Sequence, residues 1–134
     1  MTDRTASCSC GQLSIRVHGE PRGVGVCHCF ACQKRTGSVF AALAGFSRPY
    51  EASGTATEYV RVGDAGATFR FYFCPVCGTN LYKTEDGEDG SVSVAVGAFS
   101  EPTFPPPKVS AYGIRRHPWV VLPPDIVEFA KDPQ

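Results

Sequence analysis

Residues 27–37 of this chain read Cys-His-Cys-Phe-Ala-Cys-Gln-Lys-Arg-Thr-Gly, so three thiols lie close together and two basic side chains follow them. Two further cysteine groups flank this stretch, Cys8-Ser-Cys10-Gly upstream and Cys74-Pro-Val-Cys77-Gly downstream. All seven cysteines of the chain belong to these three groups. Cysteines that only fill a core would be scattered along the chain, so the clustering indicates metal binding.

The composition describes a globular protein with balanced charge. The chain has 134 residues, 43% of them hydrophobic, and 13 basic residues balance 13 acidic ones. We predict a single zinc-binding domain over residues 1–134, with a core at about residues 7–130. Nucleic acids and anionic membranes attract surfaces with an excess of basic residues, so we expect neither as a partner. We predict no particular oligomeric state.

The beginning of the chain predicts a compartment. Residues 1–7 lack the apolar segment of a secretory signal peptide, and no apolar run of the chain is long enough to cross a bilayer. We therefore expect a cytoplasmic, reducing environment, where clustered cysteines are more often metal ligands than disulfides. The odd number of cysteines also argues against a fully paired disulfide framework.

Alternation of apolar and polar residues predicts an all-β fold, mainly antiparallel, with at most short helical turns. A helical turn is expected at residues 29–35, ended by Gly37, and a short helix at residues 124–131, where Pro suits the first turn. The strands that these patterns predict lie at residues 12–18, 24–27, 39–46, 57–62, 67–73, 92–96 and, at a sheet edge, 109–112.

Large apolar side chains are expected in the core. Phe69, Phe71 and Phe73 alternate with polar residues and should form one buried stripe, and Trp119 is assigned to the core as well. His28 lies between two cysteines on extended backbone, so its ring should point away from their sulfur atoms and take a supporting or core position.

The seven cysteines can be divided between two zinc ions as four and three. Four thiolates close a structural zinc site, whereas three protein ligands leave one position for water or substrate. The set that fits the closed site has two pairs, each at the end of a predicted strand and each followed by Gly: Cys8, Cys10, Cys74 and Cys77. The three that remain are near enough in sequence to hold an ion from one loop: Cys27, Cys29 and Cys32.

A second division is also open. It places Cys29 and Cys32 with Cys74 and Cys77 in a zinc ribbon. That arrangement leaves three thiols without a role and separates its two pairs by 41 residues. Spacing alone does not fix metal connectivity, so the sequence leaves both divisions standing.

The order of the motifs carries a resemblance that spans nearly the whole chain. The pattern C-x-C-G, then C-H-C-x-x-C-[QR]-K-x-x-G-S, then F-C-x-x-C-G-[ST]-x-L is found at residues 8–11, 27–38 and 73–81. It resembles the glutathione-dependent formaldehyde-activating enzyme family, which includes centromere protein V. Val-Gly-Ala-Phe at 96–99 and His-Pro-Trp at 117–119 also resemble family positions. The resemblance implies a β-tent fold, with a structural zinc on the four-cysteine set and a catalytic zinc on the three-cysteine set.

The resemblance also implies a function. It points to a zinc-dependent carbon–sulfur lyase that joins a thiol to an aldehyde, similar to S-(hydroxymethyl)glutathione synthase. Glutathione and formaldehyde would be the small-molecule partners, and two Zn²⁺ the cofactors. A zinc ion with three thiolate ligands can hold an incoming thiol in its ionised form at neutral pH. The basic residues that could bind carboxylates of such a thiol are Lys34, Arg35, Arg115 and Arg116.

Two other functions fit the same residues. The chain could be a non-catalytic, zinc-stabilised binding module, in which the basic residues are simply solvated. It could also be a redox-sensing or zinc-sensing protein, whose three-cysteine site loses its metal on oxidation. An open zinc site that binds a thiol distinguishes the enzyme from the binding module.

Overall fold

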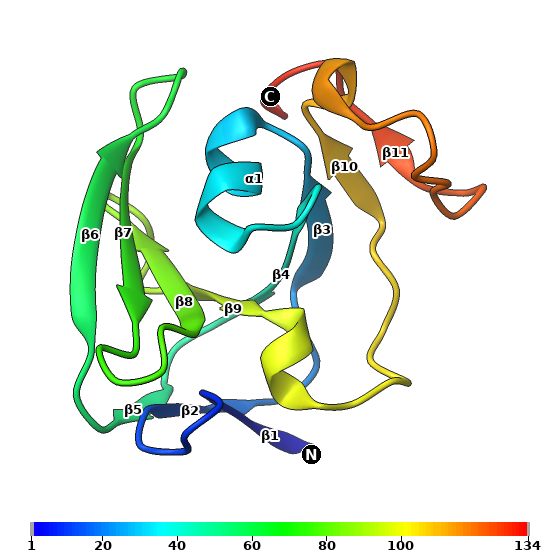
Figure 1. Ribbon diagram of the computed structural model, residues 1–134. Helices are drawn as coiled ribbons and strands as arrows, with labels where there is room; N and C mark the ends of the chain where they lie inside the picture. Colours follow the sequence, from blue (N-terminus) through cyan, green and yellow to red (C-terminus); the bar gives the residue numbers. More distant parts are fainter. Residues whose placement is uncertain (1, 134) are drawn as a thin grey trace.

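The computed structural model describes residues 2–133, which form two β-sheets and three short helical segments (Figure 1). The smaller sheet has the strand order β1–β2–β5, with β1 at Asp3–Ser7, β2 at Ser14–His18 and β5 at Glu51–Ser53. The larger sheet has the order β11–β10–β3–β4–β9–β8–β7–β6. Its strands in chain order are β3 (Gly23–Cys27), β4 (Ala41–Phe46), β6 (Thr57–Val62), β7 (Thr68–Phe73), β8 (Asn80–Glu85), β9 (Val92–Ala95), β10 (Val109–Ala111) and β11 (Val127–Glu128).

The strand pairings are antiparallel except for the two made by β10, which runs parallel to β3 and to β11. The predicted all-β, mainly antiparallel fold is therefore confirmed. The strands predicted at residues 57–62 and 67–73 form the hairpin β6–β7, with Thr57 opposite Phe73 and Val62 opposite Thr68. Strands β1, β5 and β8 were not expected from the sequence, because none of them shows a clear alternation of apolar residues.

The helical segments are short, as predicted. Helix α1 spans Phe30–Thr36, and it ends at Gly37, which has the left-handed backbone (φ 71°) that favours glycine. Two 3₁₀ turns follow later in the chain, η1 at Val96–Phe99 and η2 at Gly113–Arg115. Figure 1 shows α1 between the β6–β7 hairpin on one side and β3 with β10 on the other, at the end of the molecule opposite β1, β2 and β5.

The core lies between the smaller sheet and the adjoining part of the larger one. Ile15 and Val17 alternate along β2 and bury the same face, as the period of two requires. They belong to one cluster with Phe46 of β4 and Val94 of β9. The ring of Phe46 packs at 5.9 Å from that of Phe99 in η1. The core thus fixes the two sheets relative to each other and leaves the region around α1 for other contacts.

The prediction of a helix at residues 124–131 is wrong. The chain there forms the two-residue strand β11, which pairs with β10. The backbone N–H of Val127 donates to Lys108 O at 2.9 Å, and that of Phe129 donates to Ser110 O at 2.8 Å. These long-range bonds use the donors that a helix would have needed, and a local sequence pattern does not reveal them.

One core assignment is wrong, and a second is right only in part. Trp119 is 70% exposed, because it lies in an irregular segment after η2 rather than under a sheet. Of the phenylalanine stripe, Phe71 is buried, but Phe69 and Phe73 are only half-buried, and none of the three belongs to the core cluster. Their face of β7 points toward cationic side chains near α1 instead.

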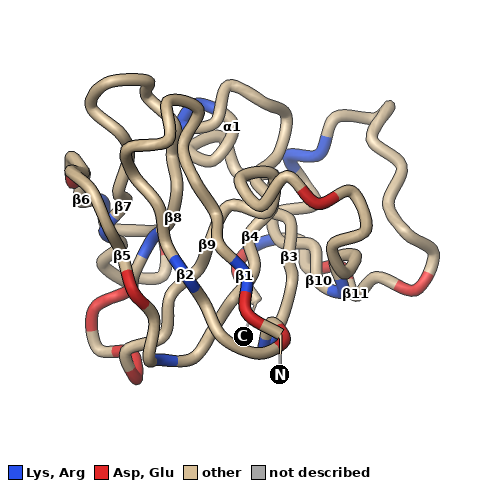
Figure 2. Tube along the Cα trace, turned by 90° about the horizontal axis from the view of Figure 1, so that it is seen from below, with Lys and Arg blue, Asp and Glu red and all other residues tan. Residues whose placement is uncertain are grey.

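Charge is distributed evenly over the chain. In the view of Figure 2, Lys and Arg are interspersed with Asp and Glu along the trace. Several of these charges form ion pairs, such as Arg70 with Asp86 at 2.8 Å and Lys108 with Asp125 at 3.0 Å. Within residues 2–133, no helix has the length and apolar character needed to span a membrane.

Candidate metal centres

The sulfur atoms of the seven cysteines gather into two groups. Within each group, the Sγ atoms lie within 4.8 Å of one another. The larger group is Cys8, Cys10, Cys74 and Cys77, and the smaller group is Cys27, Cys29 and Cys32. This is the division into four and three, and the zinc-ribbon division that mixes the groups does not form.

The four-cysteine group joins the two sheets. Its first pair lies in the turn between β1 and β2, and its second pair in the turn between β7 and β8. The Sγ of Cys10 lies 3.5 Å from that of Cys8 and 3.7 Å from that of Cys74. Each turn closes at a glycine with positive φ, 84° at Gly11 and 79° at Gly78, which an L side chain would adopt only with strain.

Neighbouring donors point at the sulfur atoms of this group. Gln12 Nε2 donates to Cys74 Sγ at 3.0 Å, and the backbone N–H of Leu13 donates to Cys8 Sγ at 3.3 Å. A hydrogen bond from the Thr79 side chain lowers the pKa of Cys77 to about 5. Because donors stabilise thiolates over thiols, the surroundings fit a metal ion that requires ionised sulfur ligands.

The three-cysteine group is formed where β3 leads into α1. Cys27 is the last residue of β3, Cys29 is the N-cap of α1, and Cys32 lies in its first turn. Cys29 Sγ accepts a hydrogen bond from the backbone N–H of Cys32 at 3.3 Å. Hydrogen bonds from Cys27 and then Cys32 lower the pKa of Cys29 to about 2, and the bond to Cys29 raises the pKa of Cys27. The neighbouring thiols thus favour ionisation of Cys29 and oppose it at Cys27 and Cys32. Three sulfur ligands so close together suit a thiophilic metal such as zinc.

The polar side chains of His28 and Gln33 hold the loop that carries these ligands. His28 is fully buried, and its Nε2 lies 3.0 Å from Ser110 Oγ, as expected for a ring that points away from the sulfur atoms. Gln33 Nε2 donates to His28 O at 2.8 Å and to Arg115 O at 3.2 Å, while Gln33 Oε1 pairs with His117 Nε2 at 3.0 Å. The sequence had given no role to Gln33 or Ser110.

A cavity of about 320 Å³ opens onto the three-cysteine group. The β6–β7 turn, β8 and the residues around Tyr112 complete its walls. Charged residues of both signs line it. The basic ones are Arg61 from β6, Lys83 from β8 and Arg115 from η2, and the acidic ones are Asp64, Glu85 and Asp132. Neither Arg61 nor Lys83 was predicted to be a site residue. Arg61 lies in a predicted strand, where a basic residue usually points to solvent, and the strand β8 that carries Lys83 was itself not predicted.

A second cavity, of about 500 Å³, lies beside the first. It shares Ala31 and Arg61 with the first cavity and is also lined by Lys34 and Arg35. None of its lining residues in the described chain is acidic. The guanidinium of Arg35 lies 4.5 Å from the ring centroid of Phe71, and its Nε and Nη2 atoms are buried without a hydrogen-bond partner. Such donors are unfavourable unless a ligand accepts from them.

The four basic residues predicted to bind substrate are thus placed differently. Lys34 and Arg35 line the second cavity, and Arg115 lines the first, with its guanidinium 4.5 Å from the ring centroid of Phe30. Arg116 lines neither cavity. It donates to Val120 O at 3.4 Å and lies 3.8 Å from a carboxylate oxygen of Glu128.

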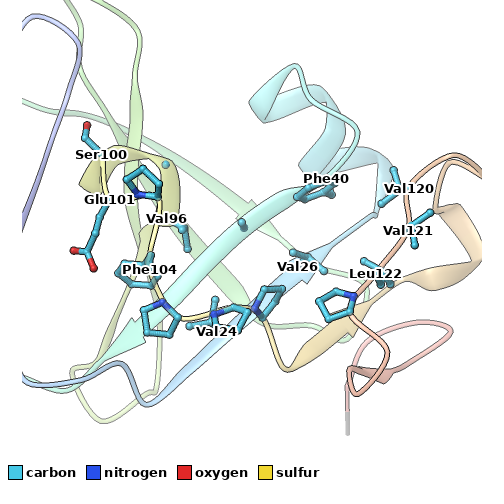
Figure 3. A pocket seen from close by; sticks show the side chains of 17 residues that line it. Val24, Val26, Phe40, Val96, Ser100, Glu101, Phe104, Val120, Val121 and Leu122 are labelled. Carbon is cyan, nitrogen blue, oxygen red and sulfur yellow. The ribbon is translucent and has the colours of Figure 1, made fainter.

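A larger hollow, of about 670 Å³, lies away from the cysteines (Figure 3). Figure 3 shows apolar side chains around it, among them Val24 and Val26 of β3, Phe40 and Leu122. None of its lining residues within 2–133 is a cysteine, and it offers few polar groups with which to bind a metal or a polar substrate.

Comparison with known proteins assigns the chain to a family. The sequence model of the glutathione-dependent formaldehyde-activating enzymes matches residues 3–115, which include all seven cysteines. The chain belongs to this family. Membership supports a glutathione-related, formaldehyde-activating function and agrees with the two cysteine groups, each of which could hold a metal ion.

A solved structure is similar as well. A crystal structure of a Rhodobacter sphaeroides protein, a structural genomics target, is similar to this chain, with a TM-score of 0.54 and 21% sequence identity. The match covers 70% of this chain and 85% of the other. At this level of identity the likeness concerns the fold alone.

Proposed function

We propose that this protein is a zinc-dependent carbon–sulfur lyase that joins a small thiol, such as glutathione, to a small aldehyde, such as formaldehyde. The observation that carries the proposal is the three-cysteine group open to a cavity lined by both basic and acidic residues, in a member of the formaldehyde-activating family. Three ligands leave one position of a tetrahedral ion for the substrate, as in catalytic zinc sites.

The two cysteine groups would take different roles. Cys8, Cys10, Cys74 and Cys77 supply four sulfur atoms and would close a structural site that clamps the two sheets. Cys27, Cys29 and Cys32 would hold the second zinc, which, when bound, lowers the pKa of an incoming thiol and keeps its sulfur ionised.

The proposed reaction is an addition to a carbonyl group. The thiolate sulfur uses a lone pair to form a bond with the aldehyde carbon, while the π electrons of the carbonyl move to its oxygen. That oxygen gains one proton, equal to the one the thiol lost, and the product is a hydroxyalkyl thioether. In the reverse direction the same carbon–sulfur bond breaks, which is the lyase reaction.

The residues of the second cavity favour a thiol substrate that carries carboxylate groups. Lys34, Arg35 and Arg61 line it without an acidic neighbour, and the buried Nε and Nη2 of Arg35 lack partners. A carboxylate would satisfy the guanidinium in the paired geometry that arginine favours. Because the two cavities adjoin at Ala31 and Arg61, one ligand can place its sulfur in the first and a carboxylate in the second.

The test begins with anaerobically purified protein. We expect two zinc ions per chain, saturable glutathione binding by calorimetry, and faster exchange between free and adduct formaldehyde by NMR than in buffer. Cys29→Ser should lose one zinc ion and the glutathione binding, with the fold retained. One zinc per chain in the wild type, with no thiol binding, would contradict the proposal and favour a structural module.

A further inference from the structure

Lys83 enters the three-cysteine cavity from the middle of β8. It pairs in register with Phe71 of β7 and Ser93 of β9, so its backbone position is fixed from both sides. Its Nζ lies 4.2 Å from the ring centroid of Phe69 and 5.9 Å from that of Phe71. The ammonium therefore stands against an aromatic wall, inside the cavity onto which the three thiols open.

The ammonium of Lys83 stands against aromatic rings, and Glu85, which lines the same cavity, makes no ion pair with it within the described residues. Among residues 2–133 it takes part in no hydrogen bond or ion pair, whereas the exposed Lys108 pairs with Asp125 at 3.0 Å. Desolvation lowers the pKa of Lys83, and the charged groups that act on it are Cys27 and Cys32, Arg35 and Glu85. Removing a cation from water without a paired anion is unfavourable, and groups kept in such a state are often functional.

The other donors that line the cavity are engaged elsewhere. The Tyr112 hydroxyl donates to Asp64 at 2.9 Å, and Arg115 stacks on the Phe30 ring at 4.5 Å. Arg61 is shared with the second cavity, where a carboxylate of the thiol would bind. Lys83 is therefore the donor available to a second, smaller substrate that meets the thiol at the three-cysteine group.

The inference rests on the proposed function. We propose that Lys83 binds the oxygen of the aldehyde and stabilises the negative charge that this oxygen acquires when the thiolate attacks. Addition to a carbonyl moves two electrons onto the oxygen, and a donor fixed beside it lowers the barrier. Lys83 passes a proton to that oxygen, and the resulting amine takes up the proton that the next thiol releases on binding. Each cycle thus moves one proton from sulfur to oxygen.

A set of three variants tests this role. Lys83→Met removes the charge and keeps the shape, Lys83→Arg keeps the charge with altered geometry, and Lys108→Met is the matched control at an exposed lysine. We expect Lys83→Met to slow the exchange of formaldehyde with its glutathione adduct by about 100-fold, as for loss of one oxyanion donor. Lys83→Arg should retain part of the rate, and Lys108→Met all of it.

Measurements other than rate separate this role from a structural one. Lys83→Met should keep two zinc ions and the wild-type glutathione affinity, and its thermal midpoint should be unchanged or higher, because an unpaired cation has been removed. ¹³C-formate is a small anion whose oxygen resembles the negatively charged oxygen of the attacked aldehyde. Its NMR signal should show saturable line broadening with the wild type and none with Lys83→Met.

The outcomes are distinguishable. Lys83→Met protein that is as fast as the wild type, or that broadens formate equally, would overturn the inference and leave the proposed function intact. Loss of zinc or of glutathione binding in Lys83→Met would show that the lysine only balances the charge of the thiolates, which also overturns it. A wild-type protein that does not accelerate the exchange would overturn the proposed function and this inference together.

Discussion

His28 Nε2 lies 3.0 Å from Ser110 Oγ, in a fully buried contact that ties the metal-ligand loop to β10. His28 stands between two ligands, Cys27 and Cys29, and β10 runs parallel to β3, which delivers them. Desolvation lowers the pKa of His28, so the imidazole is neutral at neutral pH and has one donor and one acceptor to satisfy. The position of the loop is thus set by packing as well as by any metal.

Ser110→Ala should weaken the fold by about 1–3 kcal/mol, because it leaves a buried ring nitrogen without its partner. Urea denaturation of the metal-loaded protein measures this change in the free energy of unfolding. The zinc affinity of the three-cysteine group should fall in the same variant, since its loop is less restrained. Ser53→Ala, at an exposed position of β5, is the control and should change stability by less than about 0.5 kcal/mol. Equal stability of the two variants would contradict the structural role of the His28–Ser110 contact.

The two cysteine groups should differ in what their loss does to the fold. Cys10→Ser removes a ligand from the group that joins the two sheets, so we expect the free energy of unfolding to fall by more than about 3 kcal/mol. Cys29→Ser changes a loop that other contacts also hold, and it should lose one zinc with a much smaller effect. Thermal unfolding and zinc content of both variants check this. A larger loss of stability in Cys29→Ser would reverse the assignment of the two sites.

Spacing left open which cysteine turns share an ion, because the turns at Cys8–Cys10 and Cys74–Cys77 come together only in the fold. The individual turns could be predicted, because two cysteines separated by one or two residues can bind one ion from a single turn. Helix α1 was predicted for the same reason, since its end at Gly37 is a local backbone signal. The resemblance carried by the whole set of motifs agrees with the family match over residues 3–115.

The basic residues Arg61 and Lys83 of the site could not be predicted, because strand pairing between distant segments brings them together. Arg61 looks like an ordinary polar position of an alternating strand, and the strand β8 that carries Lys83 was not predicted. Only the placement of α1 beside β6 and β8 makes both of them cavity residues. The helix predicted at residues 124–131 does not form, for a related reason. Their backbone donors are taken by β10, a strand about 20 residues earlier, and tertiary pairing overrides local propensity.

Arg35→Met should discriminate between thiols by their charge. Arg35 lines the second cavity beside Lys34 and Arg61, with no acidic residue in the described lining, so a carboxylate of glutathione should bind there. We expect the glutathione affinity to fall by about 10-fold or more, the equivalent of one charge-assisted hydrogen bond. Binding of 2-mercaptoethanol, which has no carboxylate, should not change. Calorimetry with both thiols measures this, and an equal loss for the two would place Arg35 in a structural role.

Gly54→Ala should be far more damaging than Gly66→Ala. Both glycines are exposed and have positive φ, 95° and 90°, so both substitutions carry the left-handed penalty of about 1–2 kcal/mol. A Cβ at Gly54 would also overlap the backbone carbonyl of Gln12, whereas one at Gly66 meets nothing within 4 Å. Gln12 donates to Cys74 Sγ, so its displacement should also weaken zinc binding at the four-cysteine group. Equal losses of stability in denaturation would contradict the close approach of Gly54 to Gln12.

His18 should make the smaller sheet more stable at acidic than at basic pH. Its Nδ1 lies 2.9 Å from Asp3 Oδ1 in β1, and its Nε2 lies 2.9 Å from Glu51 Oε2 in β5, so one ring bridges the two strands that flank β2. Hydrogen bonds to Asp3 and then to Glu51 raise the pKa of His18 above its ordinary value of 6.5. A raised pKa means that the folded state binds the proton more tightly than the unfolded state, so this stabilisation is complete below pH 6.5 and is lost as pH rises through the folded pKa. Urea denaturation of the wild type and His18→Gln at about pH 5.5 and about pH 8.5 tests this. Protonation of the cysteine ligands is common to both proteins, so the difference between them isolates His18. We expect a larger difference at the lower pH, and a difference that grows with pH would show that the ring bridges the strands in its neutral form.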